Sequence, residues 1–123
     1  MKFKILYVDD ERSNLRIFKD SFRRDYEIFV AESGFEALKL LKNHMVDLVI
    51  TDQRMPGMTG VELLKEITEK YDDIPPSRVI LSGYAEDDDI KRAFAEFRLS
   101  KFIPKPWNYE ELKNIISSSI QND

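Results

Sequence analysis

The chain has 123 residues, of which 42% are hydrophobic and 34% charged, with no cysteine and a formal net charge of −4. This composition excludes disulfides and thiolate metal sites, argues against a broad basic face for direct nucleic-acid binding, and contains no apolar run near the roughly 18 residues of a membrane span. Because the start, Met-Lys-Phe-Lys-Ile, does not resemble a signal peptide, we expect a cytoplasmic protein with a single domain over residues 1–123.

Short apolar runs alternate with amphipathic stretches along the whole chain, which predicts alternating strands and helices. Ser33, "TGVE" at 59–62 and "NYEE" at 108–111 have the residue types of helix N-caps. In chain order, the expected elements are a strand at Lys4–Val8, a helix at Ser13–Arg24, a strand at Glu27–Ala31, a helix at Phe35–Asn43, a strand at Asp47–Thr51, a helix from Thr59 to about Tyr71, a strand at Arg78–Leu81, a helix at Asp87–Phe97, a strand at Lys101–Ile103 and a helix from Asn108 to about Ile120.

This alternation predicts an α/β fold of the doubly wound (βα)5 type, with a parallel sheet covered by helices on both faces. Right-handed crossovers leave few topologies, of which the flavodoxin-like order 2-1-3-4-5 is common. The order reverses between strands one and three. Ligands in such sheets bind at the carboxyl ends of the strands at that reversal.

Polar side chains follow the predicted strands at this edge: Asp9 and Asp10 after the first, Asp52 after the third, Ser82 after the fourth and Lys105 after the fifth. Two adjacent carboxylates at the edge of a core repel each other. At ~4 Å and an effective dielectric of ~20, one such pair costs about 4 kcal/mol. The arrangement therefore calls for a counter-charge, a metal or a reaction.

The residue types at this edge are suited to phosphoryl chemistry. Three carboxylates are hard oxygen ligands of the kind that Mg²⁺ prefers, and Mn²⁺ accepts the same ligands. A carboxylate left partly free could attack phosphorus to form an acyl phosphate. Ser82 could donate a hydrogen bond to a phosphoryl oxygen, and Lys105 could balance the remaining charge.

Four motifs resemble the response-regulator receiver domain of two-component signalling: "VDDE" (8–11), "TDQRMPGMTG" (51–60), "ILSGY" (80–84) and "FIPKPW" (102–107). Each motif alone is weak, but together they lie in order, each at a predicted strand end. The combination also resembles receivers fused to HD-GYP phosphodiesterases or to hydrogenase-type transcriptional activators. The resemblance leaves open whether the receiver stands alone or whether its output domain lies outside this chain.

The resemblance implies a role for each matching residue, and it implies a cis peptide between Lys105 and Pro106. In receivers these positions serve as the phospho-acceptor (Asp52), as ligands of Mg²⁺ (Asp9, Asp10, Asp52 and the backbone carbonyl of Arg54), as contacts of the phosphoryl group (Ser82 and Lys105) and as the switch (Ser82 with the aromatic Phe102).

Phosphorylation is then expected to repack the face formed by the fourth helix, the fifth strand and the fifth helix, with Trp107 nearby. Arg54, two residues after Asp52, and Tyr84, two residues after Ser82, are positions where this sequence departs from the commonest receiver pattern or adjusts it. Both are bulky and are expected to flank the phosphoryl pocket and to lengthen the life of the phosphorylated state.

The implied partners are a histidine kinase or histidine phosphotransfer protein and an output domain or partner protein, and a phosphorylation-dependent homodimer is left open. The domain is expected to assist its own phosphorylation and dephosphorylation without being a conventional enzyme. The alternative is a pseudo-receiver, a protein-interaction module that is never phosphorylated. A haloacid-dehalogenase-type phosphatase is disfavoured because Asp9 begins no DxD motif, and a flavodoxin-type electron carrier because no Gly/Ser/Thr-rich loop follows the first strand.

Overall fold

The computed structural model describes residues 2–70, 77–82, 88–97, 99 and 101–121, with the side chains of Ser82, Asp88, Asp89, Phe94 and Gln121 outside the description. Strands and helices alternate along the chain. The strands are β1 (Lys4–Val8), β2 (Glu27–Ala31), β3 (Leu48–Asp52), β4 (Ser77–Ser82) and β5 (Lys101–Pro104). The helices are α1 (Arg12–Phe22), α2 (Gly34–Asn43), α3 (Gly60–Lys70), α4 (Asp88–Glu96) and α5 (Tyr109–Gln121).

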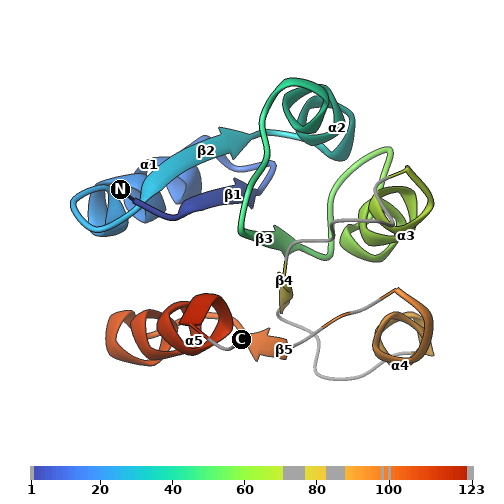
Figure 1. The fold of residues 1–123 in the computed structure, drawn as a ribbon. Helices are drawn as coiled ribbons and strands as arrows, with labels where there is room; N and C mark the ends of the chain where they lie inside the picture. The colour runs from blue at the N-terminus through green and yellow to red at the C-terminus, as the bar shows by residue number, and fades with distance from the viewer. Residues whose placement is uncertain (1, 71–76, 83–87, 98, 100, 122–123) are drawn as a thin grey trace.

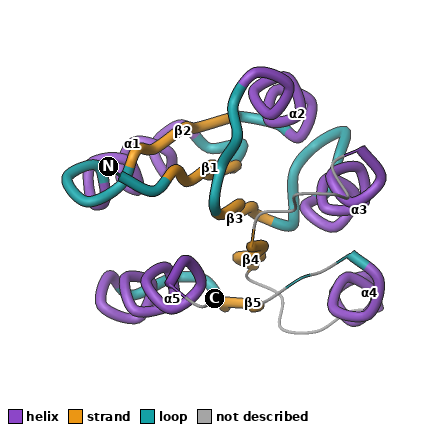
Figure 2. The backbone as a smooth tube through the Cα atoms, viewed as in Figure 1, coloured by secondary structure: helices purple, strands orange, loops and turns teal. Residues whose placement is uncertain are grey.

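The five strands form one parallel sheet in the order β2-β1-β3-β4-β5, so the predicted doubly wound, flavodoxin-like fold is confirmed. Figure 1 shows α1 and α5 on one face of the sheet and α2, α3 and α4 on the other. Figure 2 shows the loops that leave the carboxyl ends of the strands toward these helices. The strand order reverses between β1 and β3, and the loops after these two strands diverge to opposite faces.

Each face of the sheet has its own hydrophobic core. On one face, apolar side chains of β1, β3 and β4 pack against α2, α3 and α4, and on the other they pack against α1 and α5. Helix α1 buries Leu15, Phe18 and Phe22, whose spacing of three and four residues aligns them on one side of a helix. Every residue of β3 is buried, as expected for the central strand of a sheet that is covered on both faces.

The predicted N-caps of α2, α3 and α5 are confirmed. Ser33 Oγ accepts the backbone N–H of Glu36 at 3.1 Å, and Asn108 Oδ1 accepts that of Glu111 at 3.2 Å. Thr59 and Glu62 form a reciprocal capping box, with hydrogen bonds of 3.1 and 2.9 Å. These contacts satisfy backbone donors that have no partner inside the helix.

Most of the predicted elements differ from the observed ones by one or two residues at an end, and the ends of α1 and β3 are two examples. Helix α1 ends at Phe22 and not at Arg24, because the backbone N–H groups of Asp25 and Tyr26 both turn back to the Phe22 carbonyl. Strand β3 extends one residue further than predicted, because Asp52 pairs with Leu81 in the ladder. The side chain of Asp52 is therefore held by a strand and not by a loop.

Arg78 is a fully buried charged residue in β4, which the apolar strand pattern did not predict. Its Nη1 donates to the Phe97 carbonyl at 2.8 Å and to the hydroxyl of Thr68. A buried guanidinium needs such acceptors, since its desolvation is otherwise costly. Arg78 thereby joins β4 to α3 and to the segment that follows α4, at the end of the sheet away from the acidic residues.

Candidate functional site

Three carboxylates meet at the carboxyl ends of β1 and β3. The strand register pairs Val8 with Thr51, which places Asp9 and Asp52 next to each other one residue further along. Carboxylate oxygens of Asp9, Asp10 and Asp52 all lie within 4.8 Å of one another. Asp9 is fully buried, Asp52 is 8% exposed and Asp10 is exposed. The predicted convergence of these acids is therefore present.

Lys105, which follows β5, supplies the counter-charge to this cluster. Its Nζ lies 3.2 Å from Asp9 Oδ2 and 3.4 Å from Asp52 Oδ2. Burial alone would lower the pKa of the Lys105 ammonium, but the carboxylates of Asp9 and Asp52 together outweigh burial and raise that pKa. The lysine therefore stays charged between the two acids and offsets their repulsion.

The pKa of Asp52 is raised above its ordinary value of 3.8, mainly because burial disfavours the carboxylate. The positive charge of Lys105 lowers this pKa, and the negative charge of Asp9 raises it again. A carboxylate in such surroundings has lost part of its hydration while it keeps one cationic neighbour. These are favourable conditions for attack on an electrophile.

Asp9 is held by four hydrogen-bond donors. Its Oδ1 accepts the backbone N–H of Glu11 at 3.0 Å. Its Oδ2 accepts Asn14 Nδ2 at 3.1 Å, the Tyr7 hydroxyl at 3.3 Å and Lys105 Nζ at 3.2 Å. Burial and then the neighbouring Asp9 charge raise the pKa of Tyr7 well above its ordinary value. Sequence analysis missed Tyr7 and Asn14, and the signal for Tyr7 is a phenol inside an otherwise aliphatic strand.

The donor set of the acidic cluster fits a hard divalent cation. The three carboxylates provide closely spaced oxygens at one partly open position, which is how Mg²⁺ is usually bound, with water completing its coordination. A cation there would add to the positive charge that Lys105 provides. The oxygen-only chemistry of the cluster suits Mg²⁺ or Mn²⁺ better than a softer metal.

The loop between β3 and α3 is packed tightly against the end of β3. Gln53 is 4% exposed, and its side-chain oxygen accepts the backbone N–H of Val61 at 2.8 Å, which caps α3. The Gly60 N–H donates to the Gln53 carbonyl at 3.0 Å, and a Cβ on Gly60 would lie 2.5 Å from the Asp52 carbonyl oxygen. Gln53 is a third residue, after Tyr7 and Asn14, that sequence analysis missed.

The remaining predicted site residues are described to different extents. Arg54 follows Gln53 and has an exposed side chain. Ser82 ends β4 opposite Pro104, but its side chain lies outside the described residues, as does the whole of Tyr84. Phe102 is partly buried and packs against the core on the α2, α3 and α4 face. The Lys105–Pro106 peptide is cis, as the receiver resemblance implied.

Trp107 lies on the opposite face of the sheet from Phe102, on the side that α1 and α5 cover. It packs in the core beneath α1 and α5, where its ring lies 6.4 Å from Phe18 and 6.2 Å from Phe22. The chain crosses from one side of the sheet to the other after β5, and the two aromatic residues therefore report on different layers.

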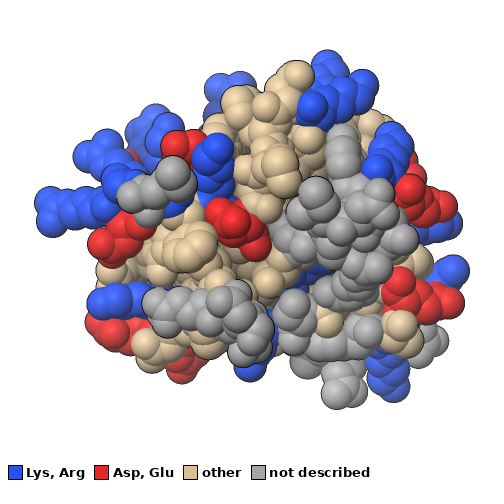
Figure 3. All heavy atoms as spheres, in the orientation of Figure 1, with Lys and Arg blue, Asp and Glu red and all other residues tan. Residues whose placement is uncertain are grey.

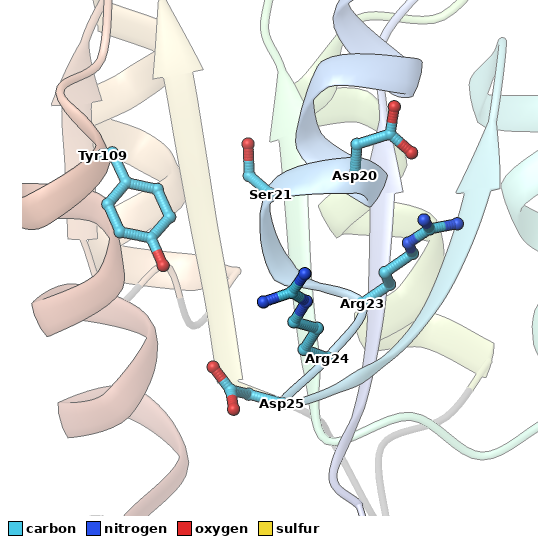
Figure 4. Close-up of a pocket in the computed structure, with 6 residues that line it drawn as sticks. All are labelled: Asp20, Ser21, Arg23, Arg24, Asp25 and Tyr109. Atoms are coloured by element: carbon cyan, nitrogen blue, oxygen red, sulfur yellow. The ribbon is translucent and has the colours of Figure 1, made fainter.

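Two hollows lie along the side of the molecule between α1 and α5. One of about 550 Å³ opens beside the acidic cluster and is lined by Asn14, Ile17, Lys105, Pro106 and Trp107. The other, of about 560 Å³, lies between the end of α1 and Tyr109, the first residue of α5 (Figure 4). Its lining combines Arg23 and Arg24 with Asp20 and Asp25, so opposite charges offset each other there, and it has no clear preference for an anion or a cation.

The surface drawn in Figure 3 carries both signs of charge. On the face drawn there, basic and acidic side chains lie interspersed among the coloured residues. Within the described helices, none combines the length and the apolar character needed to cross a membrane.

Comparisons with known proteins agree with this geometry. Residues 5–117 match the response regulator receiver domain. The chain is 35% identical over 117 residues to the hydrogenase transcriptional regulatory protein HoxA of Bradyrhizobium diazoefficiens, covering 95% of this chain and 24% of HoxA. It is 32% identical over 117 residues to sporulation initiation phosphotransferase F of Bacillus subtilis, covering 94% of this chain and 92% of that protein.

A solved structure gives the same result. The signal receiver domain of an HD domain-containing protein from Pseudomonas fluorescens Pf-5 superposes with a TM-score of 0.90 at 28% identity, over 98% of this chain and 96% of that one. Together with the sheet order 2-1-3-4-5 and the acidic cluster at its switch point, these matches identify a signalling module of the two-component class. The chain belongs to the response regulator receiver family, and it spans about a quarter (24%) of the length of the hydrogenase regulator that it matches.

Proposed function

We propose that this domain is a phosphorylation-activated switch that accepts a phosphoryl group on Asp52 from a histidine kinase or a histidine phosphotransfer protein. The observation that carries the proposal is the cluster of Asp9, Asp10 and Asp52 oxygens within 4.8 Å of one another, with Lys105 in contact with two of the three. Asp52 is the best candidate for the nucleophile, because it is the carboxylate with a raised pKa and few hydrogen-bond partners. The Asp9 carboxylate, in contrast, accepts hydrogen bonds from four donors.

In the transfer step, an oxygen of Asp52 attacks the phosphorus of the donor's phosphohistidine. The new O–P bond forms as the N–P bond breaks, and the electron pair of that bond stays on the imidazole nitrogen. Asp9, Asp10, Asp52 and the backbone carbonyl of Arg54 would hold Mg²⁺, or Mn²⁺, which supplies charge stabilisation for the transferred group. Lys105, already beside Asp52, would contact a phosphoryl oxygen and offset its charge.

The donor would approach from the side of α1. The hollow beside Lys105, lined in part by Ile17 and Trp107, offers an apolar surface next to the acidic cluster. A partner seated there would bring its histidine to Asp52 without crossing either core. The position of this hollow supports the direction of approach but does not identify the kinase.

Ser82 and Phe102 are the proposed switch residues that link phosphorylation to the output. Ser82 would donate a hydrogen bond to the phosphoryl group, and Phe102 would move inward as the end of β4 shifts. The face formed by α4, β5 and α5 would then repack for an output domain, a partner protein or a second copy of the chain. We further propose that residues 1–123 act as one receiver unit in the cytoplasm, and that the domain catalyses only its own phosphorylation and dephosphorylation.

The decisive experiment is phosphorylation by a small acyl phosphate in the presence of Mg²⁺, followed by intact-mass measurement. We expect the addition of one phosphoryl group that is labile to base and to hydroxylamine. Asp52→Asn should abolish the addition, whereas Asp20→Asn, at an exposed aspartate of α1, should leave it unchanged. Wild-type protein that is never phosphorylated, also with candidate kinases, would favour the pseudo-receiver function. Addition that persists in Asp52→Asn would assign the acceptor to another residue.

A further inference from the structure

Tyr7 connects the acidic cluster to the aromatic core beneath α1. It is fully buried in the middle of β1, and its hydroxyl donates to Asp9 Oδ2 at 3.3 Å. A phenol in this position costs desolvation that a phenylalanine of nearly the same volume would avoid. The hydroxyl therefore adds little to packing, and its main contribution is the hydrogen bond that orients the Asp9 carboxylate.

The ring of Tyr7 is fixed from the side away from Asp9. It stacks on Phe18 with the ring centroids 4.1 Å apart and the planes 5° from parallel. Phe18 in turn contacts Phe22 at 4.9 Å and Trp107 at 6.4 Å. Trp107 packs against the same core cluster, to which both Tyr7 and Phe18 belong. Packed aromatic rings leave little rotational freedom, so the position of this hydroxyl is set by the core.

The four donors on Asp9 divide into two kinds. Lys105 carries a charge that a divalent cation would duplicate, and its contact with Asp9 is the one that cation binding is expected to weaken. Tyr7, Asn14 and the Glu11 N–H are neutral and can stay in place when a cation arrives. Of these three, Tyr7 has its side chain in the core cluster against which Trp107 packs.

We propose that Tyr7 is a positioning residue for the divalent-cation site. It holds Asp9 in the orientation that the cation needs, and it transmits occupation of that site to the Trp107 indole. The inference rests on the proposed function only in that Asp9 belongs to a cation site. It does not depend on whether Asp52 is phosphorylated. Partners of ligating carboxylates typically change metal affinity by about 10- to 100-fold when they are removed.

The test is Mg²⁺ binding by the full chain, measured by calorimetry and by tryptophan fluorescence. The chain has one tryptophan, so the emission reports on Trp107 alone. In Tyr7→Phe we expect the Mg²⁺ dissociation constant to rise by about 10-fold and the Mg²⁺-induced change in emission to be lost. The matched control is Tyr109→Phe, which removes a hydroxyl from a ring that stacks on Phe22 at 5.2 Å and is not among the four donors to Asp9. Its affinity and its emission change should equal those of the wild type.

The outcomes separate this inference from the proposed function. Wild-type affinity and wild-type emission change in Tyr7→Phe would overturn the inference alone. Wild-type protein that binds no Mg²⁺ would overturn both. Normal Mg²⁺ binding without phosphorylation of Asp52 would overturn only the proposed function. If Tyr7→Phe fails to fold, Trp107→Phe measured by calorimetry replaces it, with weaker Mg²⁺ binding expected and unchanged binding overturning the inference.

Discussion

The ammonium of Lys105 lies 3.2 Å from a carboxylate oxygen of Asp9, a residue 96 positions earlier in the chain. With Asp52 Oδ2 at 3.4 Å, the lysine bridges two acids that would otherwise repel each other at the edge of the core. The contact joins β5 to the first and third strands of the sheet. It accounts for the stability of the acidic cluster before any cation is bound.

Removing this bridge should destabilise the metal-free protein. We expect Lys105→Met to lower the free energy of unfolding by about 2 kcal/mol, the scale of a hydrogen bond to a charged group, and Mg²⁺ to restore part of the loss by mass action. Lys101→Met, at an exposed lysine of the same strand, is the matched control and should change little. Urea melts of both variants with and without Mg²⁺ measure the effect. Equal stability of the two variants would show that Lys105 contributes no net attraction.

Asp9 and Asp10 should respond differently to neutralisation, although they are adjacent. Asp9 is buried with four hydrogen-bond donors, and in Asp9→Asn one acceptor oxygen becomes an amide that faces other donors. We expect a loss of about 2 kcal/mol in the metal-free protein. Asp10 is exposed, so Asp10→Asn should stay within about 0.5 kcal/mol of the wild type or be slightly stabilising. Both variants should bind Mg²⁺ more weakly. Denaturant melts give the stabilities, and an Asp9→Asn variant as stable as the wild type would contradict the assigned hydrogen bonds.

The raised pKa of Asp52 predicts a dependence of stability on pH. An acid whose pKa is higher in the folded than in the unfolded chain binds more protons when folded, so stability falls as pH rises through that interval. The interval begins near the ordinary value of 3.8 and ends at the raised value. Asp52→Asn mimics the neutral acid and should therefore stabilise the metal-free protein at neutral pH, with the difference vanishing below that interval.

Urea melts from acid to neutral pH, without divalent cations, measure this difference. Asp20→Asn serves as the control for removing one surface charge. The reverse result, an Asp52→Asn variant that is less stable than the wild type at neutral pH, would mean that attraction by Lys105 outweighs burial.

Much of the fold was predictable because its signals are local. Apolar runs, caps such as Ser33 and the capping box at 59–62 are set by neighbouring residues, and the structure confirms them. The convergence of Asp9, Asp52 and Lys105 was predictable from topology, since parallel strands end at one edge. The roles assigned to Ser82, Tyr84 and Phe102 stay predictions.

The residues that sequence analysis missed act through contacts that no local pattern encodes. Tyr7 and Asn14 resemble ordinary strand and helix residues until the fold brings them to Asp9. Gln53 resembles a loop residue until its side chain caps α3. The packing of Trp107 against Phe18 and Phe22 depends on how the chain leaves β5, which the sequence spacing does not determine.

The lifetime of the phosphorylated state should depend on Arg54 and Tyr84. Hydrolysis of the acyl phosphate needs a water in line with the phosphorus, and two bulky side chains at the rim would hinder its approach. We therefore expect a slowly dephosphorylating receiver, and Arg54→Ala combined with Tyr84→Ala should shorten the lifetime severalfold at fixed Mg²⁺. Lys39→Ala, at an exposed lysine of α2, is the control. The lifetime is measured from the decay of phosphoprotein after the phosphodonor is removed. Slower decay in the double variant would mean that these side chains assist hydrolysis.

Gly60 should be harder to replace than Gly34, the other described glycine that begins a helix. A Cβ at this position would lie 2.5 Å from the Asp52 carbonyl oxygen and 3.1 Å from the Gln53 Cα. These are backbone atoms, which can move only if the end of β3 moves with them. Gly60→Ala should therefore cost about 1–3 kcal/mol of stability, as overpacking does, and should also slow phosphorylation because it displaces Asp52.

Gly34 provides the matched comparison, because it too is the first residue of its helix. A Cβ there would meet the sulfur of Met58 at 2.5 Å, and this atom belongs to a flexible side chain that can rotate away. Gly34→Ala should thus cost less than Gly60→Ala and leave phosphorylation close to the wild-type rate. Denaturant melts and acyl-phosphate labelling of the two variants test this order. If Gly60→Ala proves no more harmful than Gly34→Ala, the end of β3 can yield, and the close approach of α3 does not fix the position of Asp52.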